Sequence, residues 1–133
     1  MKKEELNKML DVHKLWLESE GEKGNPAYLE GFDLEGINLS GVNLANANLA
    51  GANLTGANLS GCYLIETNLE DVNLTGADLE YADMEGSKLV GAIFMTELKD
   101  VADLSYCEVT KDQLPWLAMN SEYSDFYSTL NVS

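Results

Sequence analysis

The residues of this chain that could do chemistry are few, and their spacing favours no catalytic centre. The single histidine, His13, lies among apolar residues at helical spacing, so packing explains it better than ligation or proton transfer. It is therefore no base for a serine or cysteine nucleophile, and the two cysteines, Cys62 and Cys107, form no cluster with metal-ligand spacing. We expect no enzyme activity, no cofactor and no metal ligand.

Glycines and carboxylates are the other groups that could serve a site. The glycine runs match neither a phosphate-binding loop nor a dinucleotide-binding turn. Acids outnumber bases 23 to 8, the net charge is −15, and every base is a lysine. Arginine is the usual residue for phosphate contacts, so its absence argues against direct nucleic-acid binding. Glu70 and Asp71 could hold calcium weakly, but a solvated acidic face explains them more simply.

The N-terminal residues resemble no export signal. The chain runs from Met1 directly into an amphipathic segment without the apolar core of a signal peptide. No stretch approaches the ~20 apolar residues that a membrane-spanning helix needs. We therefore expect a cytoplasmic protein of one domain.

The elements that must carry these residues follow from a repeat of five. In fourteen consecutive blocks from Ala27, leucine takes the third place in twelve and glycine the fifth in nine, and the second is mostly asparagine or aspartate. On a helix, ~500° per block would spread the leucines around the circumference, and on a strand they would alternate between faces. A corner in every block removes the conflict. Places one and three then point inward, and glycine turns the corner.

Blocks such as A-N-L-A-G, A-N-L-T-G and A-D-L-E-Y resemble the pentapeptide-repeat family. The resemblance implies an all-β solenoid, a right-handed quadrilateral β-helix with four blocks in each coil. Residues 27–111 then form about four coils, between an N-terminal helical cap and linker at 1–26 and a C-terminal helical tail at 112–133. All third-place leucines from Leu34 to Leu79 are predicted to be buried.

Three further features follow from stacking coils at strand spacing. Cys62 and Cys107 point inward roughly 10 Å apart along the axis, so we expect no disulfide. Outward asparagines twenty residues apart, such as Asn48 over Asn68 and Asn38 over Asn58, are expected to form amide ladders. After Phe94 the register would bury Glu97 and Lys99, which predicts an irregular excursion at about 95–101 before the pattern resumes at 102–104.

Both ends of the coil are predicted to be covered. A helix at about 3–19, ended by Gly21, should lie on the first coil, over the large inward residues Phe32, Ile37 and Val42. At the other end, residues 110–113 have the form of a capping box and lead into an apolar tail. That tail either folds back on the last coil or pairs with a second copy. The candidate cap or dimer contacts are Trp16, Trp116, Leu117, Tyr123, Phe126 and Tyr127.

The surface residues suggest two contact features. No charge occurs between Gly36 and Ile65, whereas the following turn of the chain is strongly acidic. That acidic patch comprises Glu66, Glu70, Asp71, Asp78, Glu80, Asp83 and Glu85. With four blocks per coil, a second set falls on or beside one side of the rod, and we interpret it as a candidate interaction surface for a partner or a second copy. This set is Tyr63, Ile65, Tyr81 and Tyr106.

Two functional hypotheses follow. The first is a structural or protein-interaction module that uses its flat sides and end caps. The second comes from the family resemblance: some members mimic DNA and bind DNA gyrase, and the net charge of −11 over residues 27–111 has a comparable average density. The uncharged stretch and the short rod, ~20 Å or about six base pairs, count against the mimic.

Overall fold

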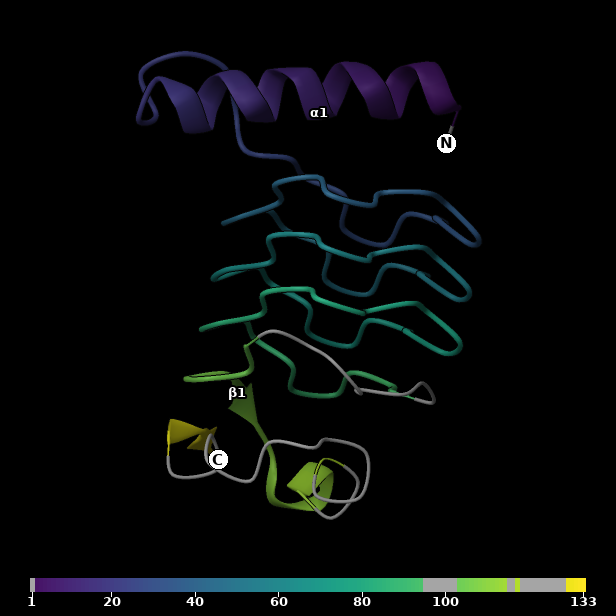
Figure 1. Cartoon of the computed structure of the whole chain (residues 1–133), viewed down its shortest axis with the longest axis vertical. Coiled ribbons are helices and arrows are strands. Elements are labelled where there is room, and N and C mark those ends of the chain that lie inside the picture. Colours follow the sequence, from purple (N-terminus) through teal and green to yellow (C-terminus); the bar gives the residue numbers. More distant parts are fainter. Residues whose placement is uncertain (1, 95–102, 115–116, 118–128) are drawn as a thin grey trace.

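The computed structural model describes residues 2–94, 103–114, 117 and 129–133 as a stack of rectangular coils with a helix across one end (Figure 1). In chain order its elements are α1 (Lys3–Glu18), β1 (Glu108–Val109), η1 (Lys111–Gln113, a 3₁₀ turn) and β2 (Asn131–Val132). None of the described helices has the length and apolar character needed to cross a membrane.

The coils repeat every twenty residues. Parallel bridges join residues twenty apart, from Tyr28↔Asn48 to Lys88↔Glu108. We number the four sides by the first coil: side one is 27–31, side two 32–36, side three 37–41 and side four 42–46. Residues twenty further along lie on the same side in the next coil. One side of the last coil, and with it the number of complete coils, falls on residues 95–102, outside the described residues.

The leucine columns form the core, as predicted. Every third-place leucine from Leu34 to Leu79 is at most 3% exposed. Thr67, at an inward first place, bonds to a main-chain carbonyl of the coil before: its hydroxyl donates to the Leu44 carbonyl at 2.9 Å. The thiols of Cys62 and Cys107 donate to carbonyls in the same way. Both cysteines are free and buried, which confirms the prediction of no disulfide.

Each corner is a β-turn that needs a left-handed residue. At one corner the Ala57 N–H donates to the Leu54 carbonyl at 3.0 Å, and Gly56 has φ +66°. A Cβ on Gly56 would meet no atom within 4 Å, so glycine is favoured there for its backbone and not for space.

The predicted amide ladders are wrong in their bonding. The coils do place Asn48 beside Asn68 and Asn38 beside Asn58. However, each side-chain oxygen accepts the N–H two residues further along, as in Asn58 Oδ1 with the Ser60 N–H at 3.0 Å. No side-chain bond joins either predicted pair within the described part of the chain. A local Asx turn, which forms within one block, engages each of these oxygens. One amide does bond between coils: Asn53 Nδ2 donates to Asp33 Oδ1 at 3.1 Å, although that oxygen also accepts the Glu35 N–H.

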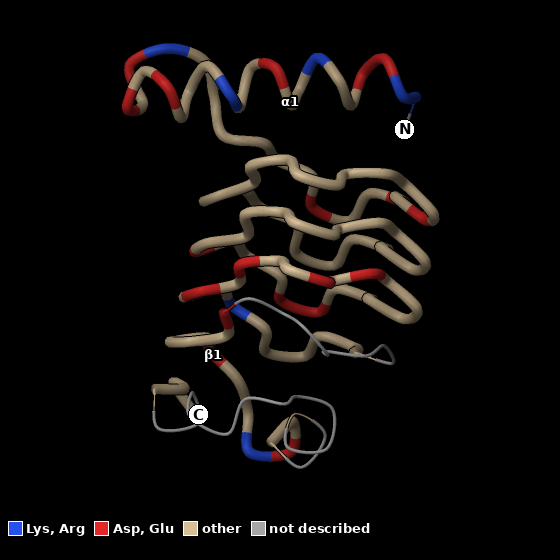
Figure 2. Tube along the Cα trace, in the orientation of Figure 1, with Lys and Arg blue, Asp and Glu red and all other residues tan. Residues whose placement is uncertain are grey.

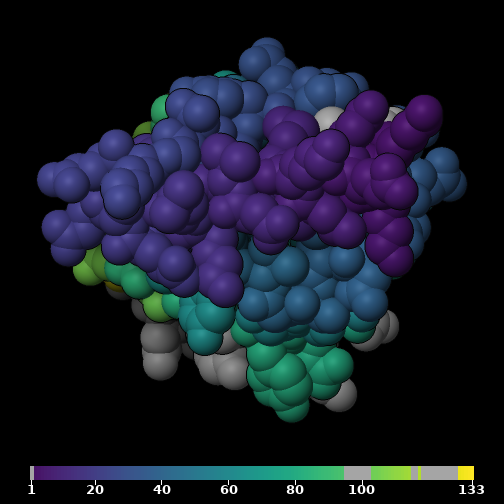
Figure 3. Space-filling view, turned by 90° about the horizontal axis from the view of Figure 1, so that it is seen from above, coloured from purple at the N-terminus to yellow at the C-terminus, as the bar shows by residue number. Residues whose placement is uncertain are grey.

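The helix α1 covers the first coil from one end. Leu6 and His13 are buried, while Met9 and Leu10 pack partly against the core. Ile37 and Val42 pack against the core from the first coil, but Phe32, predicted to lie inward, is 37% exposed. A single helix is only ~10 Å wide and crosses the coil without covering all of it (Figure 3).

The cap is fastened by two residues after the helix. The main-chain N–H of Ala27 donates to His13 Nδ1 at 3.0 Å, and the His13 ring stacks on Trp16 with ring centroids 5.8 Å apart. Gly24 has φ +73°, and a Cβ there would overlap the Val12 carbonyl oxygen. The linker therefore passes directly against the backbone of α1.

The chain also returns to the last coil at its C-terminal end. The predicted capping box is present: the Gln113 side-chain oxygen accepts the Thr110 N–H at 2.8 Å, and its amide donates to the Leu89 carbonyl at 2.7 Å. Leu117 is buried, and β2 pairs in parallel with β1, with Asn131 beside Glu108. The predicted excursion at 95–101 lies outside the described residues, but the register has resumed by Asp103, which is bridged to Asp83.

Candidate interaction surface

Side four carries an unusual outward column. In the first coil this column begins with Asn43, and the bridges then run Asn43↔Tyr63, Tyr63↔Asp83 and Asp83↔Asp103. Neighbouring coils are ~4.8 Å apart, so Tyr63 and Asp103 are separated by roughly 10 Å. Ile65 lies beside this column, and the Glu66 N–H donates to the Glu85 carbonyl at 2.9 Å, which places Glu85 one coil below Ile65.

Three exposed tyrosines surround this column. Tyr63 is 51% exposed on side four itself, Tyr81 is 66% exposed at the corner that leads into it, and Tyr106 is 54% exposed at the corner that leaves it. All three predicted tyrosines therefore reach solvent on or beside one side. Ile65, which lies beside this column, is half-buried.

Two of these tyrosines occupy backbone that glycine normally adopts. Tyr81 and Tyr106 both have φ +61°. At the corner that Tyr81 occupies, the two preceding coils have Gly41 and Gly61. For an L-residue, the left-handed conformation costs roughly 1–2 kcal/mol. Asn46, Glu66 and Asp71 turn other corners with positive φ as well, so the coil accepts residues other than glycine at these places and does not itself require tyrosine.

The C-terminal segment holds Tyr106 in place. Its N–H donates to Thr129 Oγ1 at 3.3 Å, and its carbonyl accepts the Asn131 side-chain amide at 3.1 Å. Sequence patterns gave no sign of this contact, because Thr129 and Asn131 lie beyond the repeat. The segment that pairs with β1 therefore also fixes one edge of side four.

The carboxylates of side four lie close together. Oxygen atoms of Asp83, Glu85 and Asp103 are all within 4.8 Å of one another. One oxygen of each aspartate is fixed by the turn: Asp83 Oδ1 accepts the Glu85 N–H at 3.1 Å, and Asp103 Oδ1 accepts the Ser105 N–H at 2.7 Å. Asp103 was not in the predicted acidic patch. The signal that would have found it is its spacing of twenty residues from Asp83.

The predicted acidic patch is not a single face. Its seven residues follow the chain around one coil, so they form a belt across sides one, three and four (Figure 2). Asp78 and Glu80 lie on side three, and Glu70 lies on side one with Asp71 at the next corner. Only Glu66, Asp83 and Glu85 lie on side four or its corner. Side four thus combines part of the acidic patch with the tyrosines.

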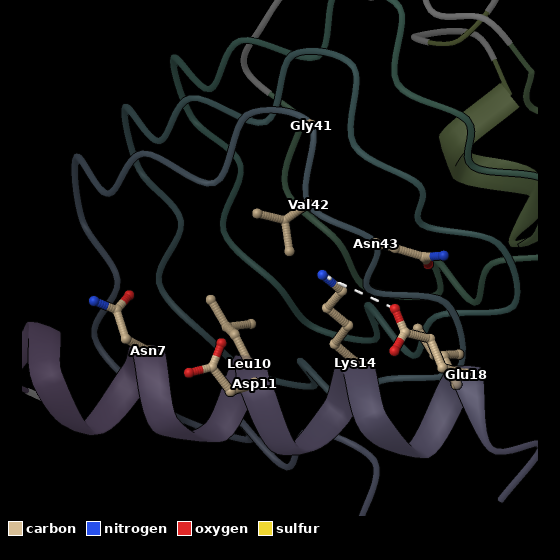
Figure 4. Close-up of a pocket in the computed structure, with 9 residues that line it drawn as sticks. Asn7, Leu10, Asp11, Lys14, Glu18, Gly41, Val42 and Asn43 are labelled. Carbon is tan, nitrogen blue, oxygen red and sulfur yellow. Dashed lines mark ion pairs between the residues drawn. The ribbon is translucent and has the colours of Figure 1, made fainter.

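A groove adjoins the upper end of side four. It has a volume of about 630 Å³ and lies between α1, which contributes Leu10, Lys14 and Glu18, and the first coil, which contributes Val42 and Asn43 (Figure 4). Lys14 Nζ is 3.9 Å from Glu18 Oε1 within the groove. Asn43 also begins the outward column of side four, so the groove and that side share a border.

The side chains that could act as a base or a nucleophile, those of the histidine and the two cysteines, are held in the interior. His13 is 1% exposed with its Nδ1 engaged by Ala27, and burial lowers its pKa below 6.5. Burial also raises the pKa of both Cys62 and Cys107 to about 11. Of the candidate cap or dimer contacts, Trp16 stacks on His13 and Leu117 is buried. The other four, Trp116, Tyr123, Phe126 and Tyr127, lie outside the described residues.

Comparison with protein-family models identifies the repeat region. The model described as pentapeptide repeats matches in eight copies over residues 27–61 and 57–94. No curated protein sequence matches the chain.

Solved structures with similar coils come from several sources. A pentapeptide repeat protein of the Arabidopsis thaliana thylakoid lumen is 23% identical, with 76% of this chain and 84% of that chain covered and a TM-score of 0.54. HetL of Nostoc sp. strain PCC 7120, involved in heterocyst differentiation regulation, is 30% identical over 62% of this chain and 44% of its own, with a TM-score of 0.45. QnrB1, a plasmid-mediated fluoroquinolone resistance protein, is 20% identical over 86% and 69%, with a TM-score of 0.39.

Proposed function

The chain belongs to the pentapeptide-repeat family of right-handed β-helices, and on that premise we propose that it is a non-enzymatic protein-interaction module that contacts its partner through side four. The observation that carries the proposal is the exposure of Tyr63, Tyr81 and Tyr106 around one side of a stacked coil. Tyrosine is enriched at the centres of protein interfaces, because its ring buries much area and loses little conformational freedom.

The rigid coil suits this role. Main-chain bonds join the successive coils along side four: the Tyr63 N–H donates to the Val42 carbonyl at 3.1 Å, and the Leu64 N–H donates to the Asp83 carbonyl at 2.6 Å. The outward side chains are therefore presented at fixed spacing, which lowers the entropic cost of binding. The neighbours of Tyr63 in its column, Asn43 and Asp83, have shorter side chains, and Tyr63 is half exposed.

The burial of the cysteines and the histidine supports a role without catalysis. A nucleophile needs an ionised or base-activated side chain near solvent. Cys62 and Cys107 are both buried, each with a pKa raised to about 11, so their thiolates are scarce at neutral pH. His13 is a buried residue of α1, and its Nδ1 accepts the Ala27 N–H.

Site-specific photo-crosslinking tests the proposal with a matched control. A photoreactive phenylalanine replaces Tyr81 in one variant and Tyr28 in another; Tyr28 is a comparably exposed tyrosine, at 61%, on side one. In extract of the source cells, the variant at 81 should give a discrete adduct that the variant at 28 does not give. Equal labelling from both positions, or none from 81, would contradict the role of side four. An adduct of twice the chain's mass would identify the partner as a second copy.

A DNA mimic that acts on DNA gyrase is the second candidate, and the acidic belt is the observation that favours it. Glu66 to Glu85 carries seven acids and no base, and the net charge of −11 over residues 27–111 has an average density comparable with duplex DNA. The belt is confined to one coil, however, and the coil above it is neutral (Figure 2). DNA presents charge evenly along its length, so this distribution favours the interaction module.

Supercoiling by purified gyrase separates the two candidates. The chain is titrated into the assay while light scattering gives its mass in the same buffer. Inhibition at stoichiometric concentration, by a dimer long enough to replace a stretch of duplex, would establish the mimic. Unchanged supercoiling at a large excess of the chain would exclude it and leave the interaction module.

A further inference from the structure

The structure also indicates what kind of partner side four fits. We propose that side four recognises a positively charged, arginine-bearing segment of a partner protein, with the arginines stacked on its tyrosines and paired with its carboxylates. This inference rests on the proposed function, because it assumes that side four is the contact surface. It adds the chemistry of the partner.

Side four lacks cations of its own. Asp83, Glu85 and Asp103 converge within 4.8 Å, yet the ion pair found among the described residues is Lys14–Glu18 on α1. Asp83 and Asp103 are directly opposed across neighbouring coils, an arrangement in which like charges repel. A cationic partner would remove this repulsion on binding.

The coil does not require acids at the places of Asp83 and Asp103. The equivalent positions of the same column are Asn43 and Tyr63. Asparagine makes the same turn, since Asn43 Oδ1 accepts the Ala45 N–H at 3.0 Å, just as the aspartates accept theirs. Neutral residues would therefore preserve the fold without the repulsion. The coil therefore does not require the charges of Asp83 and Asp103.

Side four also combines aromatic rings with these carboxylates. Tyr63 lies directly above Asp83 in the column, and Tyr106 follows Asp103 at the next corner. A guanidinium group can stack on an aromatic ring and still donate two hydrogen bonds to a carboxylate at the ring's edge. Lysine satisfies the carboxylate but stacks less well. The column from Tyr63 to Asp103 is roughly 10 Å long, which matches about three residues of an extended segment.

A second copy of the chain fits this surface poorly. The chain contains no arginine, and its net charge of −15 makes two copies repel at low ionic strength. Five of the eight lysines lie within the first 23 residues, where α1 and its linker carry acids as well. The complementary charge must therefore come from a different protein.

Peptide binding tests the inference directly. Three labelled probes alternate glycine with arginine, lysine or glutamine, and their anisotropy is followed in low salt as the full chain is added. We expect the arginine probe to bind about two- to fivefold more tightly than the lysine probe, and the glutamine probe not to bind. Equal binding of arginine and lysine probes, or no binding of the arginine probe, would overturn the inference.

Matched variants separate recognition from general attraction to an acidic protein. The pair Asp83→Asn/Asp103→Asn removes two charges from side four, and Glu70→Gln/Asp71→Asn removes two charges from side one and its corner. Both keep the fold, since Asn43 makes the same turn as the aspartates and Asn46 has the backbone of Asp71, with φ +63° against +55°. Asp83→Asn/Asp103→Asn should weaken binding of the arginine probe about two- to tenfold more than Glu70→Gln/Asp71→Asn does. Equal weakening would mean that only net charge matters and would refute the proposal.

The aromatic contribution has its own control. Tyr63→Ser/Tyr81→Ser should abolish the preference for arginine over lysine, whereas Tyr28→Ser on side one should leave it intact. These tyrosines are exposed, so the substitutions remove little packing. If the preference survives in Tyr63→Ser/Tyr81→Ser, the stacking that we propose does not occur.

Failure of this inference can be told apart from failure of the proposed function. If the crosslink from position 81 persists unchanged in Asp83→Asn/Asp103→Asn and at high salt, side four binds a partner by other chemistry and only the cationic segment is refuted. If position 81 gives no crosslink above position 28, the contact surface itself is refuted.

Discussion

Replacing Gly24 with alanine tests how the cap is held on the coil. Gly24 has φ +73°, and a Cβ there would overlap the Val12 carbonyl oxygen and lie 3.0 Å from the Trp16 main-chain nitrogen. Both neighbours are helix backbone, so neither can move away as a flexible side chain could. The linker must then lift from α1, or α1 must shift on the first coil.

Gly56→Ala provides the matched control. Gly56 has φ +66°, almost the same backbone, but its Cβ would meet no atom within 4 Å. The left-handed conformation alone costs roughly 1–2 kcal/mol, reduced by the lower entropy of the unfolded alanine variant. We therefore expect Gly56→Ala to lower the free energy of unfolding by about 1 kcal/mol, and Gly24→Ala by about 3 kcal/mol or more, because the overlap adds to the strain.

Urea denaturation followed by circular dichroism measures both values, and amide hydrogen exchange reports on α1 separately. In Gly24→Ala the amides of Lys3–Glu18 should exchange faster, while those of the central coils keep their protection. If the two variants differ by less than about 0.5 kcal/mol, or if exchange of α1 is unchanged, then the contact between Gly24 and the helix does not hold the cap.

Two further predictions follow from buried titratable groups. Because burial lowers the pKa of His13 below 6.5, the unfolded chain takes up a proton more readily than the folded chain. The stability of wild type relative to His13→Gln should therefore be greatest above pH 6.5 and fall as the pH drops toward the folded pKa; a constant difference in paired urea titrations would contradict this. Because the pKa of both thiols is raised to about 11, Cys62 and Cys107 should react with a disulfide reagent at pH 8 only at the rate of unfolding. Immediate reaction of either thiol in the native state would be inconsistent with their burial.

The repeat made the coil predictable from sequence. Leucine at every fifth residue can be buried throughout only if the chain turns a corner in each block. The burial of Leu34 through Leu79 therefore followed from the pattern alone. The grouping of Tyr63, Tyr81 and Tyr106 needed one more fact, the four blocks in each coil, which came from the family resemblance. Once this phasing was known, residues far apart in sequence could be assigned to one side.

The parts that were wrong or missed depend on local geometry that the repeat does not encode. The predicted pairs Asn48–Asn68 and Asn38–Asn58 do not bond to each other. The side-chain oxygens of Asn48 and Asn58 accept the N–H two residues further along in their own turns, whereas Asn53 does donate to Asp33 of the first coil. Phe32 was expected beneath the cap, but the orientation of α1 on the coil decides which residues it covers. Asp103 was overlooked because it follows the break after Phe94, and Gly24 because nothing in the pattern shows that it touches α1.

The exposed tyrosines themselves allow the most direct test of side four as the contact surface. Hydroxyl-radical footprinting of the unmodified chain, in buffer and in extract of the source cells, compares four tyrosines that are all more than half exposed. Our account predicts that Tyr63, Tyr81 and Tyr106 become protected in the extract while Tyr28 on side one keeps its reactivity. Protection of Tyr28 in place of the other three, or equal reactivity of all four in both conditions, would contradict it.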